Sequence, residues 1–459
     1  MKNIIKEIEK IVGNEWVIKE KEKMLNYIFD ETPLPIRPKP SENIILVKPK
    51  STEEISQILK LANQEKIPVY PRGGGTGLVG GCIPTKDGII LSLERMDNIE
   101  IDKDNLMAIA EAGATLGKLL SISESSGLFF PPHPGDEGAQ IGGLIACNAA
   151  GARTVKYGPI RNFVKGIEVV LPSGEVLKIG GKLLKNNFSY DLMDLIIGSE
   201  GTLAIITKAI IRLYPPPKAI LTLIVPYENR HDAINSVPKI LQEGIIPLAI
   251  EYVEKDVIEI SAKHINKKWP IEEGMAYLII IVDGMSEEEV YGECEKIVEI
   301  CKSFNSLEPI VATSKEEQKN ILDIRSNIYT ALKPNTADIL DVTVPPSSIG
   351  KLMDIVDNIA KKFSTYLPTF GHAADGNLHV HIMMDKIDEI DNIRNEIYIA
   401  TLELEGTITG EHGIGEARIK YIHNFMDKKQ YEIMLKIKEI FDPNNILNPG
   451  KRIPLFRQS

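Results

Sequence analysis

Three of the chain's eight histidines lie within ten residues of one another, in the stretch GHAADGNLHVHI at 371–382. An Asp-Gly pair in the middle of this stretch is a turn signal, so we expect His372 to end one strand and His379 to lie in the returning strand. Imidazoles on neighbouring strands can share a metal such as zinc, manganese or iron. His381 shares a strand face with His379 and would be a further ligand or a group that supports the ligands. A hydrogen-bonded hairpin without metal is the alternative.

A second polar stretch, GTITGEHGIGEAR at 406–418, holds Glu411 and His412 in a loop framed by glycines. The Glu411 carboxylate would complete a two-histidine metal site and leave positions open for a substrate. His412 is placed to act as a general base, because the pKa of imidazole lies near neutral pH. An exposed charged turn is the alternative.

The densest run of glycines, PRGGGTGLVGG at 71–81, follows an apolar run at 67–70. Glycines let the backbone approach a ligand and turn its N–H groups inward, which suits a diphosphate. A dinucleotide fingerprint would open into a helix and a P-loop would end in Gly-Lys-Ser/Thr, but here another strand follows at 89–93. We therefore expect a diphosphate clamp between strands, with a flexible surface loop as the alternative.

A second region with little side-chain bulk, at 131–158, follows a predicted helix at 115–126. Two such regions in one domain predict opposite walls of a narrow ligand slot. His133 lies at the start of this region, where it would touch a bound ring or serve as a structural histidine.

The elements that position these residues can be read in outline. Ser51 and Glu54 have capping-box spacing at the start of a helix that follows the strand 44–47, which gives a β-α-β unit with the glycine loop at its carboxyl end. One or two amphipathic helices are predicted within residues 1–30, and a hairpin around 172–174. From residue 218 the pattern predicts antiparallel sheets with helices on one face. In that part, strands are expected near 220–225, 246–253, 276–282 and 339–344, and helices near 231–243, 286–303, 314–332 and 347–363.

Composition narrows the class of protein. With 459 residues, 43% hydrophobic and 25% charged, the chain has material for two to four packed domains. A net charge of −11 disfavours nucleic acid as a partner. The four cysteines are too far apart for a disulfide framework or an Fe–S ligand run. We expect neither a signal peptide nor a transmembrane segment, and hence a cytoplasmic protein, with attachment to a membrane through a partner as the alternative.

The motifs taken together resemble a known family. In chain order they are PRGGGTG, PPHPGDEGAQIGG with NAAGARTVKYG, IGSEGTLAIIT, GHAADGNLH, GEHGIG and NPGK. They resemble the FAD-linked 2-hydroxyacid dehydrogenases, the group of D-lactate dehydrogenase and glycolate oxidase, over about residues 40–452. The resemblance implies an α+β fold: a two-part FAD-binding domain of the p-cresol methylhydroxylase type plus an antiparallel-sheet substrate (cap) domain. We expect the FAD-binding domain at 1–217, the cap domain at 218–415, and a C-terminal helical segment at 416–459 that returns to the FAD domain.

The resemblance also implies the site residues. A divalent metal (zinc, manganese or iron) would be held by His372, His379 and Glu411, with His412 as the base and Arg325 on the substrate carboxylate. Ala374 stands where the family usually has glycine, and His381 often corresponds to asparagine. Residues expected near FAD are Pro71, Arg72, Gly73, Gly74, Gly75, Thr76, Gly77, Leu78, Pro132, His133, Gly135, Gly142, Gly143, Asn148, Gly151, Gly158, Glu200, Gly201, Ile205, Ile206 and Asn448.

The activity implied is oxidation of a D-2-hydroxyacid to the 2-oxoacid, with hydride transfer to flavin. The resemblance favours D-lactate over D-2-hydroxyglutarate, because Tyr329 and the apolar pair Ile339-Leu340 correspond to positions where family members acting on 2-hydroxyglutarate carry polar residues for the second carboxylate. Glycolate, an oxidase reaction with oxygen, and a non-catalytic flavin-binding subunit are the alternatives. Without an Fe–S run or an NAD fingerprint, electrons would pass to an external electron-transfer flavoprotein, Fe–S subunit or quinone. The oligomeric state is open, with a homodimer as one option.

Overall fold

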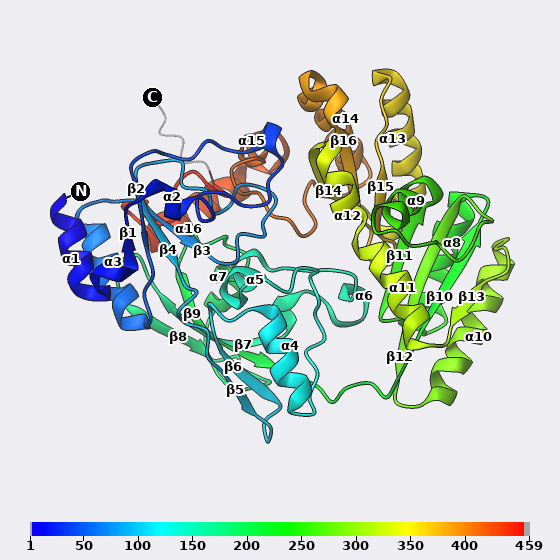
Figure 1. Ribbon diagram of the computed structural model, residues 1–459, viewed down its shortest axis with the longest axis horizontal. Helices are drawn as coiled ribbons and strands as arrows, with labels where there is room; N and C mark the ends of the chain where they lie inside the picture. The colour runs from blue at the N-terminus through cyan, green and yellow to red at the C-terminus, as the bar shows by residue number, and fades with distance from the viewer. Residues whose placement is uncertain (1, 454–459) are drawn as a thin grey trace.

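Three β-sheets organise the chain in this computed structural model, which describes residues 2–453. The N-terminal part forms a four-stranded sheet, β1-β2-β4-β3, and a five-stranded sheet, β5-β6-β9-β7-β8. The middle of the chain forms a seven-stranded sheet, β13-β10-β12-β11-β15-β16-β14, in a separate half of the molecule (Figure 1). Residues 454–459 of the predicted C-terminal segment lie outside the described residues. Among the described residues, no helix is both long and apolar enough to cross a membrane.

The first sheet confirms the predicted β-α-β unit. β2 and β3 both run parallel to β4, and the Ser51 side chain caps α3 by accepting a hydrogen bond from the Glu54 N–H. The glycine loop leaves the carboxyl end of β3, as expected. Of the predicted N-terminal helices, α1 is long but α2 is a single turn. The bounds are α1 (Lys2–Val12), β1 (Val17–Ile18), α2 (Lys21–Met24), β2 (Ile44–Val47), α3 (Thr52–Gln64), β3 (Val69–Arg72) and β4 (Gly88–Ser92).

The second sheet is antiparallel throughout and contains the predicted hairpin, β7–β8. Its apolar side chains join those of α3 and of the first sheet in one core. The bounds are β5 (Ile99–Asp102), β6 (Met107–Glu111), α4 (Leu116–Ser125), α5 (Ile141–Cys147), α6 (Thr154–Tyr157), β7 (Val164–Val170), β8 (Val176–Gly180), α7 (Leu192–Ile196) and β9 (Ile205–Arg212).

The seven-stranded sheet is antiparallel and carries helices on both faces, so the prediction of helices on one face was wrong. One face packs against α8, α10, α13 and α14. The other face is covered in part by α9, α11 and α12, because Ile224, Val253 and Ile279 point apolar side chains that way. The bounds are β10 (Ala219–Tyr227), α8 (Arg230–Gln242), β11 (Ala249–Glu254), α9 (Lys255–His264), β12 (Ala276–Gly284), α10 (Glu287–Ser303), β13 (Ile310–Ala312), α11 (Lys315–Ser326), α12 (Ile328–Leu332), β14 (Thr336–Thr343), α13 (Ile349–Phe363), β15 (Thr369–His372), β16 (Asn377–Met383) and α14 (Ile390–Glu403).

In the C-terminal segment, α15 (Ile419–Phe425) packs on the core of the seven-stranded half through Tyr421, and α16 (Lys428–Phe441) returns to the N-terminal half; both appear in orange-red in Figure 1. Leu447 forms a parallel bridge with Val69, and Lys438 Nζ donates to the Thr202 carbonyl at 2.7 Å. The chain therefore passes from one half to the other twice. The predicted domain boundaries after residues 217 and 415 stay predictions.

Candidate active site

The part of the seven-stranded sheet that α9, α11 and α12 leave free carries a row of polar side chains. Strand register sets this row, because Glu251 is paired with His372, while His379 is paired with both Phe370 and Asp341. Paired residues in neighbouring strands place their side chains on the same face. The hairpin β15–β16 confirms the predicted positions of His372 and His379 on adjacent strands.

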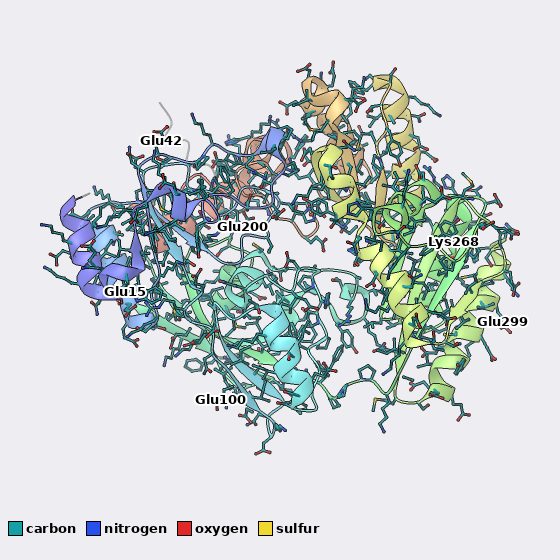
Figure 2. All side chains as sticks on the ribbon, in the orientation of Figure 1. Glu15, Glu42, Glu100, Glu200, Lys268 and Glu299 are labelled. Atoms are coloured by element: carbon teal, nitrogen blue, oxygen red, sulfur yellow. The ribbon has the colours of Figure 1, made fainter. Side chains whose placement is uncertain are left out.

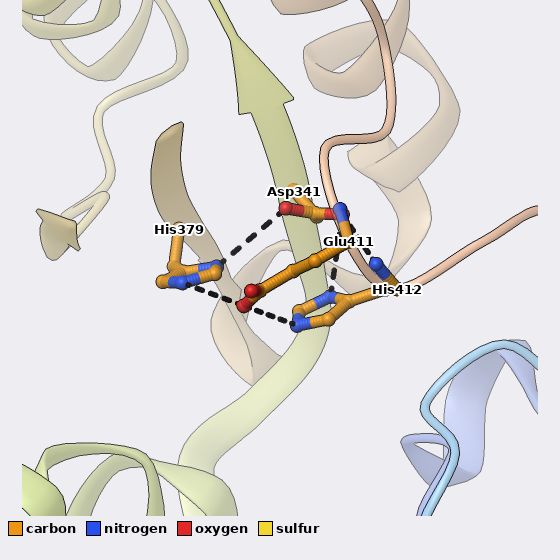
Figure 3. Close-up of side chains that lie close together, drawn as sticks. All are labelled: Asp341, His379, Glu411 and His412. Atoms are coloured by element: carbon orange, nitrogen blue, oxygen red, sulfur yellow. Dashed lines mark hydrogen bonds and ion pairs between the residues drawn. The ribbon is translucent and has the colours of Figure 1, made fainter. Parts of the chain in front are cut away.

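The loop after α14 brings Glu411 and His412 to this row (Figure 3). The Nε2 atoms of three imidazoles surround Glu411 Oε1, at 3.4 Å for His379, 3.7 Å for His412 and 4.0 Å for His372. The rings of His379 and His412 are stacked, with centroids 5.2 Å apart. All four side chains are largely withdrawn from solvent.

The spacing of these atoms fits a divalent cation. A tetrahedral zinc ion with bonds of about 2.0–2.1 Å requires ligand atoms about 3.3 Å apart, close to the separations around Glu411. Asp341, His379, Glu411 and His412 offer ligand atoms that all lie within 4.8 Å of one another. This group includes the predicted base His412, whereas the predicted ligand His372 lies outside it, with its Nε2 4.0 Å from Glu411 Oε1. Imidazole nitrogens and a carboxylate are the donors that zinc, manganese and iron take.

Asp341 belongs to this group of four, but its carboxylate is already used. Its Oδ2 accepts hydrogen bonds from the backbone N–H groups of Gly410, Glu411 and His412 at 2.7–2.9 Å, and one from the Thr409 hydroxyl at 3.1 Å. Its Oδ1 accepts from Asn377 Nδ2 at 2.7 Å. A carboxylate has about four acceptor positions, so Asp341 is better suited to anchoring the loop than to binding a metal.

The electrostatics of the cluster follow from burial and these close contacts. Burial opposes charge on His372, but the Glu251 carboxylate raises the pKa of His372 to about 9. Burial raises the pKa of Glu411 to about 8, with Asp341 adding to the effect and His372 opposing it. Burial lowers the pKa of His412 below its ordinary value, against the pull of Asp341. At neutral pH His412 is therefore an imidazole with a free lone pair.

His381 lies on the same strand face but makes different contacts. The Thr336 hydroxyl donates to the Leu332 carbonyl at 2.9 Å, so it accepts from His381 Nδ1, also at 2.9 Å. The hydrogen on Nδ1 leaves Nε2 as an acceptor, and this atom is buried with no partner among the described residues. Burial lowers the pKa of His381 to about 3. The ring is therefore neutral.

Arg325, the predicted substrate residue, lies on α11 at the edge of the cluster. Its guanidinium sits 4.8 Å from the Phe370 ring centroid and forms an ion pair with Glu251. Glu251 also binds His372 Nδ1 at 2.5 Å, so one carboxylate links Arg325 to the histidine row. The Arg325 Nε is buried without a hydrogen-bond partner among the described residues.

The two glycine-rich regions, which were predicted to form the walls of one ligand crevice, meet in the N-terminal half. A Cβ on Gly73 would lie 3.6 Å from the Cα of Gly143, and one on Gly74 would lie 2.6 Å from the carbonyl oxygen of Gly138. A Cβ on Gly151 would lie 2.8 Å from the His133 carbonyl oxygen. At these closest approaches the neighbouring backbone leaves no room for a Cβ, and a glycine-rich backbone of this kind suits a phosphate-bearing ligand such as FAD.

The remaining cofactor positions gather at the same place. A Cβ on Gly201 would lie 2.6 Å from Pro71 Cγ, while Asn448 Nδ2 donates to the carbonyls of Gly81 and Glu200 at 2.9 and 2.7 Å. Asn448 Oδ1 is buried with no partner among the described residues, and is available to a donor group of a cofactor. Also in these loops and helix ends are Gly75, Thr76, Gly77, Leu78, Pro132, Gly135, Gly142, Asn148 and Gly158.

Four predicted cofactor residues use their side chains elsewhere. The Arg72 guanidinium lies beneath the glycine loop and donates to the carbonyls of Phe29 and Asn26 at 2.8 and 2.7 Å. The side chains of Ile205 and Ile206 are buried in the core. His133 is half-buried near Glu137, with 3.4 Å between His133 Nε2 and Glu137 Oε1. At these positions only backbone groups, or a rotated side chain, would reach a cofactor.

Glu200 ties the crevice to the histidine cluster, and it lies near the middle of the molecule (Figure 2). Its carboxylate accepts from the backbone N–H groups of Ile414 and Gly415 at 2.9 and 2.7 Å. The loop that carries Glu411 and His412 is therefore held from one half by Asp341 and from the other by Glu200.

Sequence reasoning missed Asp341 and Glu251. Both are single carboxylates inside strands that were predicted from apolar residues, at 339–344 and 246–253. A charged residue in a buried strand requires a partner, and this signal was available. The sequence does not identify the partners, because they lie about 70 and 120 residues away along the chain.

Protein-family comparisons identify both halves of the chain. The sequence matches the family described as FAD linked oxidases, C-terminal domain, at residues 216–452, and that described as FAD binding domain at residues 44–180. It is 42% identical to a D-lactate dehydrogenase of Archaeoglobus fulgidus, over 93% of this chain and 95% of that protein. It is 39% identical to the glycolate oxidase subunit GlcD of Bacillus subtilis, over 88% of each.

The solved structure of p-cresol methylhydroxylase with substrate bound has the same fold. Its TM-score is 0.80 at 17% identity, covering 100% of this chain and 98% of the other. The predicted α+β architecture, an FAD-binding domain with an antiparallel-sheet second domain, is thereby confirmed. The chain belongs to the FAD-linked oxidases.

Proposed function

We propose that this protein oxidises a D-2-hydroxyacid to the 2-oxoacid, with D-lactate as the preferred substrate. The observation that supports this most strongly is the convergence of three imidazole Nε2 atoms on the Glu411 carboxylate, with Arg325 joined to them through Glu251. A 2-hydroxyacid needs both parts: a group that handles the hydroxyl proton and a cation that binds the carboxylate. The named relatives, a D-lactate dehydrogenase and a glycolate oxidase subunit, point to the same substrate class.

Each residue has a role in this proposal. His372, His379 and Glu411 would hold a divalent metal, which lowers the pKa of a ligated hydroxyl much as it lowers that of water from about 15.7 to about 7. His412 accepts the hydroxyl proton at Nε2, because its ring is neutral at working pH and its Nε2 lies 3.7 Å from Glu411. Arg325 binds the carboxylate by donating hydrogen bonds. FAD, when bound, supplies the two-electron oxidant.

A small monocarboxylate suits the surroundings of His381. Ile339 is paired with His381 on the same face and is buried, and the Tyr329 ring lies 6.2 Å from the His381 ring. Neither side chain offers a cation to a second carboxylate. D-2-Hydroxyglutarate is therefore the less favoured substrate.

A non-catalytic flavin-binding subunit is the second candidate, but an intact cluster of histidines and carboxylates argues against it. An electron-transfer flavoprotein, an Fe–S subunit or a quinone would take the electrons, with oxygen as the alternative. We propose a location in the cytoplasm, with or without attachment to a membrane through such a partner.

Anaerobic titration of the FAD-loaded protein tests the proposal. D-Lactate should bleach the flavin absorbance near 450 nm, whereas L-lactate should leave it unchanged. A flavin that stays oxidised with D-lactate, glycolate and D-2-hydroxyglutarate alike would overturn the enzymatic assignment and favour the non-catalytic alternative.

A further inference from the structure

We propose that Glu251 is a positioning residue that couples the metal site to the substrate carboxylate site. It holds His372 with one carboxylate oxygen and Arg325 with the other. The inference rests on the proposed function, because it assigns a metal to His372 and a carboxylate to Arg325. It adds a residue that touches neither ligand but sets the geometry and charge of both sites.

The position of Glu251 follows from the sheet. It lies in β11, its side chain is 5% exposed, and strand register places it directly opposite His372. Its Oε1 lies 2.5 Å from His372 Nδ1. An ionised carboxylate only accepts hydrogen bonds, so Nδ1 carries the hydrogen. The nitrogen left for a metal is Nε2, which is the atom that faces Glu411 at 4.0 Å.

The second oxygen acts on Arg325. Glu251 Oε2 pairs with Arg325 Nη2, and the Phe370 ring lies against the guanidinium. These two contacts fix the plane of the Arg325 guanidinium group. The Arg325 Nε remains without a hydrogen-bond partner among the described residues, although it is buried. Guanidinium has five N–H donors, so an incoming carboxylate finds donors that are already oriented.

One buried carboxylate therefore serves two neighbouring groups. Removing its charge leaves Arg325 uncompensated and allows the His372 ring to rotate, so both sites are altered at once. A residue that positioned only His372 or only Arg325 would change either the metal affinity or the substrate affinity, but not both. Carboxylate partners of metal-bound histidines change metal affinity by about 10–100-fold when they are mutated.

The test uses the Glu251→Gln protein loaded with FAD. The amide keeps the side-chain volume but presents one acceptor oxygen and an NH₂ group in place of two acceptors. Zn²⁺ affinity, measured by competition with a chromophoric chelator, should weaken by about 10–100-fold. The D-lactate concentration that half-saturates flavin reduction should rise at least about tenfold, because Arg325 loses the charge-assisted hydrogen bond to Glu251 that orients its guanidinium for the substrate carboxylate.

Two further variants control the experiment. Asp283→Asn also neutralises a buried carboxylate that is paired with a cation, Lys156, and it lies four residues along β12 from Ile279, the residue paired with Glu251. It should leave the Zn²⁺ affinity unchanged. Glu251→Asp keeps the charge on a shorter side chain and should recover part of both losses. Flavin absorbance and circular dichroism report whether each variant is folded.

The outcomes separate the inference from the proposed function. A parent protein that binds no Zn²⁺ overturns the metal assignment itself. If the parent binds Zn²⁺ and both Glu251 variants bind it equally well, the positioning role is wrong. If Zn²⁺ affinity falls while the half-saturating D-lactate concentration stays the same, the coupling is wrong.

Discussion

At the scale of single residues, His412 and His381 compete for the role of base, and their surroundings differ. His412 directly follows Glu411 and its Nε2 lies 3.7 Å from that carboxylate. His381 is held by Thr336, and burial lowers its pKa to about 3, so it is a poor proton acceptor at neutral pH. These contacts favour His412 as the base and His381 as a buried structural residue.

His412→Ala should therefore lose about 10²–10⁴-fold in the rate of flavin reduction, the usual contribution of a general base. His381→Ala, the matched control, should lose less. Both variants should keep FAD. Rapid mixing of D-lactate with each protein measures the two rates, and a more damaged His381 variant would reverse the assignment.

At the scale of elements, α5 and the glycine loop form the crevice proposed for FAD. Gly143 lies within α5, and an added Cβ would lie 3.9 Å from its nearest neighbour, the Cα of Gly73. Gly143→Ala should favour the helix by about 1 kcal/mol while narrowing the crevice. We expect a stable protein with a lower FAD content. Gly292→Ala in α10, where nothing lies within 4 Å of the new Cβ, should gain helix stability and keep FAD. Equal FAD content in the two purified proteins would place the crevice elsewhere.

Another element-scale feature is the ion cluster that attaches α14 and α15 to β14. The fully buried Asp338 carboxylate binds Arg394 and Arg418, each through two nitrogens. Burial opposes its charge, but Arg418 and Arg394 hold the pKa of Asp338 below its ordinary value. The contribution to stability is therefore present above the unfolded-state pKa, about 3.9, and is lost as pH falls through the folded-state pKa.

Asp338→Asn should reduce the free energy of unfolding by about 3–5 kcal/mol, the cost of leaving buried charges without their partner. Asp354→Asn removes an exposed partner of His231 and should cost at most about 1 kcal/mol. Urea unfolding of both proteins at pH 7 measures the difference. Equal urea concentrations at the midpoints of unfolding would show that the ion cluster contributes nothing to stability.

The sequence predicts local features better than long-range ones. The histidine hairpin, the cap at Ser51 and the strand after the glycine loop depend on neighbouring residues, and all three were predicted. The direction of Arg72 was not, because its acceptors are carbonyls more than 40 residues earlier in the chain. The anchor Asp341 was missed for the same reason. The helices on both faces of the large sheet were missed, although the unbroken apolar run at 276–282 is typical of a strand that is covered on both faces.

At the scale of the whole molecule, one loop depends on both halves. Asp341 in the seven-stranded sheet holds the N–H groups of Gly410–His412, while Glu200 in the N-terminal half holds those of Ile414 and Gly415. The pair sets the position of His412 relative to the crevice proposed for FAD. A misplacement of about 1 Å can cost about 10²-fold in rate.

Glu200→Gln should therefore keep the Zn²⁺ affinity, because Asp341 still holds the N–H of Glu411, and should slow flavin reduction by about 10–10²-fold. Chelator competition and rapid mixing measure the two quantities. An unchanged rate would mean that the loop keeps its position without this contact.

In the proposed reaction, the cluster around Glu411 activates the substrate through a metal. The most direct measurement is single-turnover reduction of the bound flavin by D-lactate in three samples: untreated, depleted by a chelator, and resupplied with Zn²⁺ or Mn²⁺. We predict that depletion abolishes flavin reduction while FAD and the fold remain, and that one of the metals restores the rate. Full-rate reduction in a sample that elemental analysis shows to be free of metal would show that the cluster does not activate the substrate through a metal.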